Sequence, residues 1–201
     1  YSGRSIGFAV NQGCLISVNN NPNKIFNYRL VYSDIEETNN PEEIKHKMLY
    51  TLIKHRQIKK IEIHYDATLG KCNGLGTSSA FACALTAYDL TQQNSLLEEY
   101  SIARGAISLE RDLMNEFGGW QDQIYSAYGG ICDISFSNNN FYVSQIKPNR
   151  DALNKLNENL FLIVQKRTKC ETSLKNANIK LNQNIISLRE FDNLYTAAAQ
   201  S

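Results

Sequence analysis

The sequence lacks a net charge of either sign and lacks any long apolar run. Lys and Arg total 21 against 20 for Asp and Glu, which leaves a formal charge of +1. Such a balance gives no field that would concentrate nucleic acid or anionic lipid. The longest apolar stretches fall far below the ~20 residues that cross a bilayer, and residues 1–5 do not resemble a secretory signal. We therefore expect a cytoplasmic chain with no nucleic-acid partner and no membrane partner.

Cysteine is present, but its spacing does not indicate disulfide bonds or a metal site. The five cysteines are an odd number, are widely spaced and include no CxxC pair. A disulfide framework and a zinc site are therefore disfavoured. Cys83 lies in the apolar run Ala80-Phe-Ala-Cys-Ala-Leu, which is typical of a small buried side chain in a reducing compartment.

The apolar content, 42%, is enough for one sizeable core or for two small lobes that share an interface. Strict alternation over 60–66 predicts a half-buried strand on which His64 faces solvent. Strands first, then a helical layer, then strands again indicate an α+β domain. Further strands are expected within 7–19 and 24–32 and at 131–136, 141–146 and 160–165, helices at 41 to about 55, 77 to about 90, 95 to about 114 and beyond about 171, and turns at 19–21 and 138–140.

A glycine-rich loop between the strand at 60–66 and the next helix carries the first functional signal. It reads Gly70-Lys-Cys-Asn-Gly-Leu-Gly76 and is followed at once by Thr77, Ser78 and Ser79. Glycines let the backbone approach a ligand, and a helix start offers unpaired N–H groups and the positive end of the helix dipole. The loop therefore predicts an anion site, although a tight turn with a helix cap remains the alternative. It is neither a Walker A loop nor a dinucleotide fingerprint.

Two carboxylates downstream could complete a phosphoryl-transfer site. Glu110 lies near the end of a predicted helix, and Asp122 lies in the segment Gly118-Gly-Trp-Gln-Asp-Gln123. Phosphoryl transfer needs one carboxylate to hold Mg²⁺ and one to orient or deprotonate the attacking hydroxyl. The alternative from composition alone is an exposed Glu and an Asp at a helix cap.

The strings GLGTSSA (74–80), LERDL (109–113) and GGWQDQ (118–123) resemble the GHMP kinases, and most of all the branch of L-fucokinase and D-glycero-D-manno-heptose 7-phosphate kinase. The resemblance implies a two-domain GHMP architecture. Its N-terminal α/β sandwich, which binds ATP, would be largely present at 1–150, and 151–201 would begin a ferredoxin-like C-terminal domain. Because both ends stop inside apparent elements, we expect the chain to be a fragment of a longer kinase, with a natural remnant as the alternative.

The same resemblance implies a role for each matching residue. Asp122 would be the catalytic base, and Ser78 and Glu110 would hold Mg²⁺. Trp120 and Gln121 would contact the sugar, with a core anchor as the alternative for Trp120. The backbone around the nucleotide phosphates would come from Asn73, Gly74, Leu75, Gly76, Thr77, Ser78 and Ser79.

The implied reaction uses ATP and Mg²⁺ to phosphorylate the anomeric hydroxyl of a fucose-like sugar or a heptose 7-phosphate, giving a sugar 1-phosphate. Gly70 and Cys72 depart from the family's Pro-x-Gly opening, so an inactive sugar- or nucleotide-binding regulator on the same scaffold is one alternative, and a plain structural domain is another. A homodimer is left open. The basic run at 54–60 is interpreted as solvated, Arg104 and Arg111 as surface residues, and Arg167 as a group that could reach a phosphate.

Overall fold

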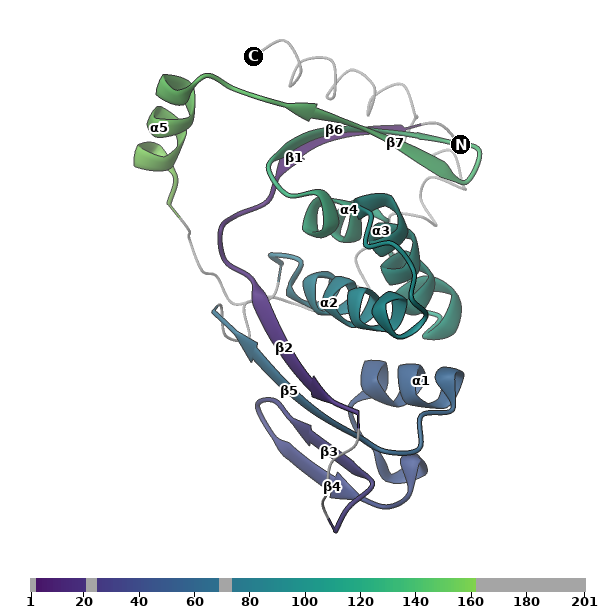
Figure 1. The fold of residues 1–201 in the computed structure, drawn as a ribbon. Helices are drawn as coiled ribbons and strands as arrows, with labels where there is room; N and C mark the ends of the chain where they lie inside the picture. Colours follow the sequence, from purple (N-terminus) through teal and green to yellow (C-terminus); the bar gives the residue numbers. More distant parts are fainter. Residues whose placement is uncertain (1–2, 21–24, 69–73, 162–201) are drawn as a thin grey trace, which may run out of the picture. The chain divides into compact units, whose positions relative to one another are not determined.

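The computed structural model describes residues 3–20, 25–68 and 74–161, which divide into two compact units. Unit 2 comprises Asn11–Glu116 and Asp122–Ala127, and unit 1 comprises the described parts of Tyr1–Val10, Phe117–Gln121 and Tyr128–Ser201. Each unit combines a sheet with helix, in agreement with the predicted α+β class (Figure 1).

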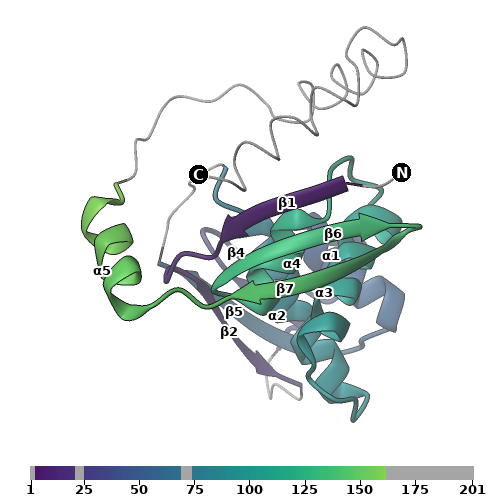
Figure 2. The same ribbon diagram turned by 90° about the horizontal axis from the view of Figure 1, so that it is seen from above.

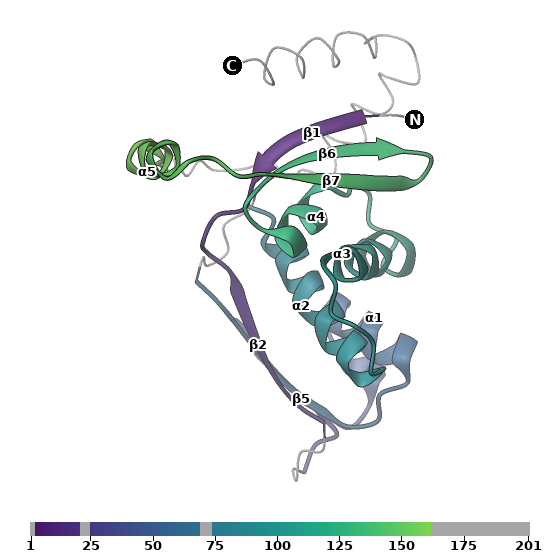
Figure 3. The same ribbon diagram turned by 45° about the horizontal axis from the view of Figure 1, so that its top comes forward.

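Unit 2 is built on a four-stranded sheet in the order β2-β5-β3-β4. Strand β3 pairs parallel with β5, whereas the two outer pairings are antiparallel. Figure 3 shows β2 and β5 lying side by side along their length. The strands are β2 (Cys14–Asn19), β3 (Tyr28–Val31), β4 (Ile35–Thr38) and β5 (Ile61–Ala67).

The core of unit 2 lies where this sheet meets helices α1 (Lys47–Arg56) and α2 (Thr77–Gln92). Small residues on α2 allow close packing, and its Ala82 and Leu85 are fully buried. The predicted alternation along β5 holds for exposed His64, but Glu62 is buried, because Arg29 on β3 binds its carboxylate at 2.7 Å. The largest fully buried apolar side chains of this core are Leu30, Leu49, Ile53, Ile61, Ile63 and Leu85.

The helix predicted from residue 41 is in fact two elements, a single 3-10 turn η1 (Pro41–Glu43) and α1, separated by extended backbone at Ile44. The cause is Glu36 on β4, a buried carboxylate that no pattern in the sequence indicated. It accepts hydrogen bonds from the backbone N–H groups of Lys45 at 2.6 Å and His46 at 3.0 Å. These bonds hold the chain extended until His46 caps α1.

The helix predicted at 95–114 begins later and changes character before its end. Helix α3 (Glu99–Ile107) continues into a π-helical segment, η2 (Ser108–Leu113). Its wider turn is visible in the bond from the Met114 N–H to the Leu109 carbonyl, 3.0 Å long. π-helical turns are rare and are frequently found at functional sites.

Helices α2 and α3 approach each other closely at Gly105. A Cβ atom placed on Gly105 would lie 2.4 Å from Cγ2 of Thr86, which is buried on α2. Glycine is therefore required at this position by space rather than by backbone conformation. The contact sets how near α3, and with it η2, lies to α2.

Unit 1 contains an antiparallel sheet in the order β1-β6-β7, shown from above in Figure 2. The strands are β1 (Gly3–Phe8), β6 (Ile131–Ser137) and β7 (Asn140–Ile146), so both late strands were predicted correctly. Asn138 and Asn139 take positive φ in the predicted turn between them. Helix α5 (Arg150–Asn159), which starts at an Asn149 cap, was not predicted.

Several expectations fall outside the described residues. Of the strand expected at 160–165 only the first two positions are described, and neither lies in a strand. The helix beyond 171 lies wholly outside the described residues, as does Arg167. The expected C-terminal domain at 151–201 is described only as far as residue 161. Among the described helices, none has the length and apolar character needed to cross a membrane.

The Gly105 contact gives a stability prediction. We expect Gly105→Ala to lower the free energy of unfolding by about 1–3 kcal/mol, because the added methyl overpacks a buried site. Thr86→Ser removes the clashing methyl, so the double variant should recover much of that loss, as measured by urea denaturation. Equal stability of Gly105→Ala and wild type would contradict the close approach of α2 and α3.

The imidazole of His46 is half-buried between two aromatic rings, with centroid separations of 4.9 Å to Tyr32 and 5.5 Å to Phe81. Its Nδ1 accepts the Leu49 N–H at 3.5 Å as the cap of α1. Burial lowers the pKa of His46, against the opposing effect of the Glu36 charge. The folded protein therefore favours the neutral ring.

A group with a lowered folded pKa binds its proton more readily in the unfolded chain, so it destabilises the fold as the pH falls. We expect the free energy of unfolding to decrease between pH 7.5 and pH 5.5. His46→Asn keeps a capping side chain but cannot titrate, and it should show a smaller decrease in urea denaturation at the two pH values. An identical decrease in both proteins would assign the effect elsewhere.

Candidate active site

The predicted glycine loop leads directly into α2, as expected. Gly74 has φ +108°, and Gly76, the N-cap residue, has φ +67°. Among the described residues no side chain caps this helix, so none of them supplies a capping oxygen to the N–H groups of its first turn. Leu75 is 37% exposed and Thr77 is half-buried. Asn73, the first residue of the predicted phosphate-binding stretch, lies outside the described residues.

The first turn of α2 holds the carboxylate of Glu110, which comes from η2. Ser78 donates its hydroxyl to Oε1 at 2.9 Å, and Ser79 donates to Oε2 at 3.0 Å. The amide Nε2 of Gln123, on α4 (Gln121–Tyr128), also donates to Oε2. Glu110, Ser79 and Gln123 are buried, whereas Ser78 is exposed. The structure therefore unites the two predicted metal ligands, Ser78 and Glu110.

Glu110 is a buried acidic side chain that has no positively charged partner among the described residues. Its side chain is 2% exposed, and within the described ranges no Lys, Arg or His forms an ion pair with it. Burying an unpaired charge is costly, so such a site favours a bound cation. One carboxylate and one hydroxyl suit Mg²⁺, which usually takes one or two carboxylates and completes its shell with water and phosphate. In the part of the chain described here, no three His, Cys, Asp or Glu side chains form a metal cage.

Asp122, the predicted base, lies beside the glycine loop. A Cβ placed on Gly76 would be 3.5 Å from Cβ of Asp122 and 3.9 Å from its Oδ2. Asp122 is in the first turn of α4 and is exposed, so it can meet a ligand from solvent. The starts of α2 and α4 thus bring a carboxylate next to the predicted phosphate loop.

The predicted sugar contacts, Trp120 and Gln121, belong to unit 1. Both line an open hollow of about 480 Å³ together with Gly118, Gly119 and residues of the turn between β6 and β7, namely Phe136, Ser137, Asn139 and Asn140. Trp120 is half-buried and Gln121 is exposed. A ring flanked by amides and a hydroxyl is suited to a polar ligand with an apolar face, such as a sugar.

Two side chains of the site had roles that the sequence did not reveal. Ser79 was predicted as part of the phosphate loop, but its hydroxyl is directed to Glu110. Gln123 was given no role, although helical spacing from Trp120 through Gln123, Ile124 and Ala127 could have indicated a buried amide. Gln123 is fully buried, and its Oε1 has no hydrogen-bond partner among the described residues.

Cys83, beneath this cluster, is the inert side chain that the sequence predicts. Its thiol donates to the Gln123 carbonyl at 3.3 Å. Burial, with a smaller effect of the Glu110 charge, raises the pKa of Cys83 to about 12. The thiol therefore joins α2 to α4 and is not a nucleophile at neutral pH.

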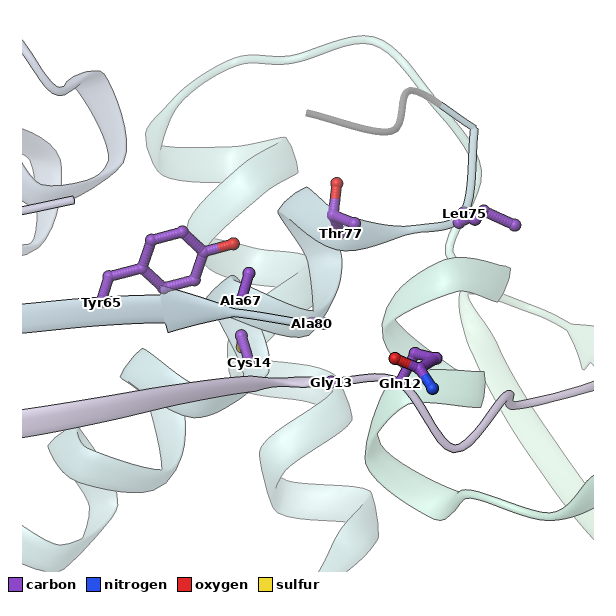
Figure 4. Close-up of a pocket in the computed structure, with 8 residues that line it drawn as sticks. All are labelled: Gln12, Gly13, Cys14, Tyr65, Ala67, Leu75, Thr77 and Ala80. Carbon is purple, nitrogen blue, oxygen red and sulfur yellow. The ribbon is translucent and has the colours of Figure 1, made fainter. Parts of the chain in front are cut away.

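A narrow cavity lies at the base of the loop, where the start of β2, the end of β5 and the start of α2 meet (Figure 4). Its volume, about 20 Å³, is comparable to the space of one water molecule and is far too small for a nucleotide. Residues around it include Gly13, Tyr65 and Thr77. A nucleotide would have to bind on the open side of the loop.

Other predicted residues lie apart from this cluster or differ from expectation. Arg56 pairs with Asp89 at 2.6 Å, and Lys54 pairs with Glu42, which agrees with a solvated basic run. Arg104 and Arg111 were predicted as surface residues but are half-buried.

The chain is similar to known GHMP kinases. Residues 43–130 match the family model for the GHMP kinases N terminal domain. No curated protein matches the chain.

Among solved structures, a D-glycero-D-manno-heptose 1-phosphate kinase from Bacteriodes thetaiotaomicron is 21% identical with a TM-score of 0.65, over 78% of this chain and 55% of that chain. The galactokinase of Lactococcus lactis, solved with galactose, is 12% identical with a TM-score of 0.53, over 81% and 53%. The mevalonate kinase of Methanococcus jannaschii is 17% identical with a TM-score of 0.54, over 72% and 49%.

The chain thus spans about half the length of these solved structures. At such identities the likeness concerns the fold, and the glycine loop, Glu110 and Asp122 all fall within the matched residues. The described chain has the fold of a GHMP kinase N-terminal domain.

Proposed function

We propose that the protein containing this chain is an ATP-dependent sugar kinase. The observation that carries the proposal is the buried carboxylate of Glu110, bonded to the Ser78 hydroxyl at the start of α2. Among the described residues this carboxylate has no cationic partner and the helix has no side-chain cap. The N-terminus of a helix can bind the phosphates, and a neighbouring carboxylate can bind the metal ion. Together they fit a metal-bound polyphosphate. The GHMP kinase fold supports the same function.

The phosphates of ATP would bind at the start of α2. Backbone N–H groups of 73–79 would donate to phosphate oxygens, and the helix dipole would favour their negative charge. Positive φ at Gly74 and Gly76 gives the loop a tight path that a side chain would obstruct. Because the chain has a net charge of only +1, nucleotide affinity would depend on this local arrangement.

Ser78 and Glu110 would hold Mg²⁺, since their oxygens lie 2.9 Å apart and Ser78 is exposed. When bound, Mg²⁺ supplies the charge neutralisation that phosphoryl transfer requires. The remaining task of the protein is to align the acceptor hydroxyl with the γ-phosphate.

Asp122 would act as the base. Its carboxylate would accept the proton of the sugar hydroxyl as that oxygen forms a bond to the γ-phosphorus, while the bond from the γ-phosphorus to the β-phosphate oxygen breaks and ADP leaves. Proximity of Asp122 to Gly76 supports this role, because it puts an exposed carboxylate next to the predicted phosphate loop.

The acceptor we propose is the anomeric hydroxyl of a fucose-like sugar or a heptose phosphate, giving a sugar 1-phosphate. The motif Gly118-Gly-Trp-Gln-Asp-Gln123 supports this branch, and the hollow lined by Trp120 and Gln121 supports a sugar ligand. A heptose-phosphate kinase and a galactokinase share the fold. A mevalonate kinase shares it too, so the fold by itself does not select the acceptor.

Removing the base tests the chemistry. In the full-length protein, Asp122→Asn should lower kcat about 10²- to 10⁴-fold, the usual contribution of a general base. The Kd for Mg-ATP, from isothermal titration, should change little. Asp112→Asn alters an exposed acid outside the cluster and should retain wild-type activity.

The assay is a screen of L-fucose, heptose phosphates and galactose, with the product detected by phosphorus NMR. Wild-type turnover by Asp122→Asn would refute the base assignment. Binding of sugar and ATP by the wild-type protein with no sugar phosphate formed would instead favour a catalytically inactive regulator.

Gly76→Ala tests the phosphate loop. Because φ is +67°, the added side chain should cost about 1–2 kcal/mol and should displace the backbone that meets the phosphates. We expect Mg-ATP binding to weaken at least about tenfold by isothermal titration. The control is Gly13→Ala, whose added Cβ meets nothing within 4 Å. Equal nucleotide affinity in both variants would place the phosphates elsewhere.

A further inference from the structure

We propose that Gln123 is a positioning residue, which together with Ser79 fixes one oxygen of Glu110 so that the other, beside Ser78, faces the divalent cation. The proposal rests on the function proposed above and assigns a role to a side chain that carries none there. The two carboxylate oxygens of Glu110 accept hydrogen bonds from different donors, and this difference supports the proposal.

The two oxygens of Glu110 have different partners. Oε2 accepts from two buried groups, the Ser79 hydroxyl at 3.0 Å and the Gln123 amide. Among the described residues Oε1 accepts from Ser78 alone, at 2.9 Å, and Ser78 is exposed. One oxygen is therefore held by two buried donors, and the other is bonded to an exposed hydroxyl, which is the side from which a cation could reach it.

The orientation of the Gln123 amide follows from charge. With the amide reversed, its carbonyl oxygen would face the carboxylate of Glu110, and two acceptors would repel each other. The orientation that donates to Oε2 leaves the amide Oε1 buried without a partner among the described residues. A buried polar atom left unpaired costs about 1–3 kcal/mol. An apolar side chain of similar size would avoid that cost but would remove a donor from Oε2, so the glutamine here serves the carboxylate of Glu110 and not the packing around it.

The position of Gln123 in α4 links the base to the metal carboxylate. Asp122 is exposed and Gln123 is fully buried, because neighbouring helical residues point about 100° apart. The Gln123 carbonyl also accepts the Cys83 thiol at 3.3 Å, which ties this turn to α2. The same turn of helix thus presents the proposed base outward and restrains Glu110 inward.

The test measures metal binding separately from turnover. In the full-length protein we compare Gln123→Met, of similar size but without a donor, with Ser79→Ala, which removes the other donor to Oε2. Mn²⁺ affinity in the presence of ADP is measured by electron paramagnetic resonance. Loss of an outer-shell partner typically weakens metal affinity about 10- to 100-fold, and we expect a decrease in that range for both variants.

Kinetics provide a second readout. In Gln123→Met the Mg²⁺ concentration for half-maximal activity should rise about tenfold or more, whereas the kcat of this variant at saturating Mg²⁺ should stay within about threefold of wild type. Gln93→Met, an exposed glutamine at the far end of α2, should match wild type in both measurements. Should Gln123→Met fail to fold, the Mn²⁺ affinity of Ser79→Ala decides whether the donors to Oε2 hold Glu110 for the metal.

The outcomes separate this inference from the function on which it rests. Absence of Mg-ATP binding by the wild-type protein would overturn both. Wild-type binding with unchanged Mn²⁺ affinity in Gln123→Met and Ser79→Ala would overturn the positioning role alone. A decrease confined to kcat, with Mn²⁺ affinity unchanged, would also contradict it, because a residue that acts through Glu110 must alter metal binding.

Discussion

The buried carboxylate of Glu110 is the constraint on which the candidate site depends. Glu110 belongs to η2, and its carboxylate lies against α2 and α4. It accepts hydrogen bonds from two serines of α2 and from one glutamine of α4. With 2% of its surface exposed and no cationic partner in the described ranges, it is expensive to bury. Three helix segments converge on one anion, so the geometry of each is tied to the others.

Packing elsewhere in unit 2 supports this convergence. The close approach of α3 to α2 at Gly105 sets the distance at which η2 begins, and the Cys83 thiol ties α2 to the first turn of α4. Glycine at the loop and glycine between the helices serve different needs, because Gly76 requires a left-handed backbone whereas Gly105 requires space. A change in the packing of α2, α3 or α4 in the core of this unit would therefore also move the side chains of the site.

Much of the secondary structure could be predicted from the sequence wherever a local pattern determines it. Alternation over 60–66 and the asparagine turn at 138–140 gave strands within a residue or two of their observed bounds, and the glycine loop gave the start of α2. The extended break at Ile44 could not be predicted from local sequence. Its cause is the buried Glu36 on β4, whose carboxylate bonds the backbone nine residues further along the chain. The roles of Ser79 and Gln123 were missed for the same reason, since hydrogen bonds between distant residues leave no periodic signal.

The π-helical turn of η2 has a consequence for how this segment can evolve. Its wider turn accommodates an extra residue relative to an α-helix, and the chain then continues to Glu116, whose N–H binds the Glu110 carbonyl at 2.9 Å. Each residue of a helix rotates the next by about 100°, so deleting one residue between Ser108 and Glu110 would turn the carboxylate away from α2. Point substitutions on the outer face would leave that rotation unchanged. The site therefore depends more strictly on the length of this segment than on the identity of most of its residues, and an insertion or deletion there would remove Glu110 from the serines of α2.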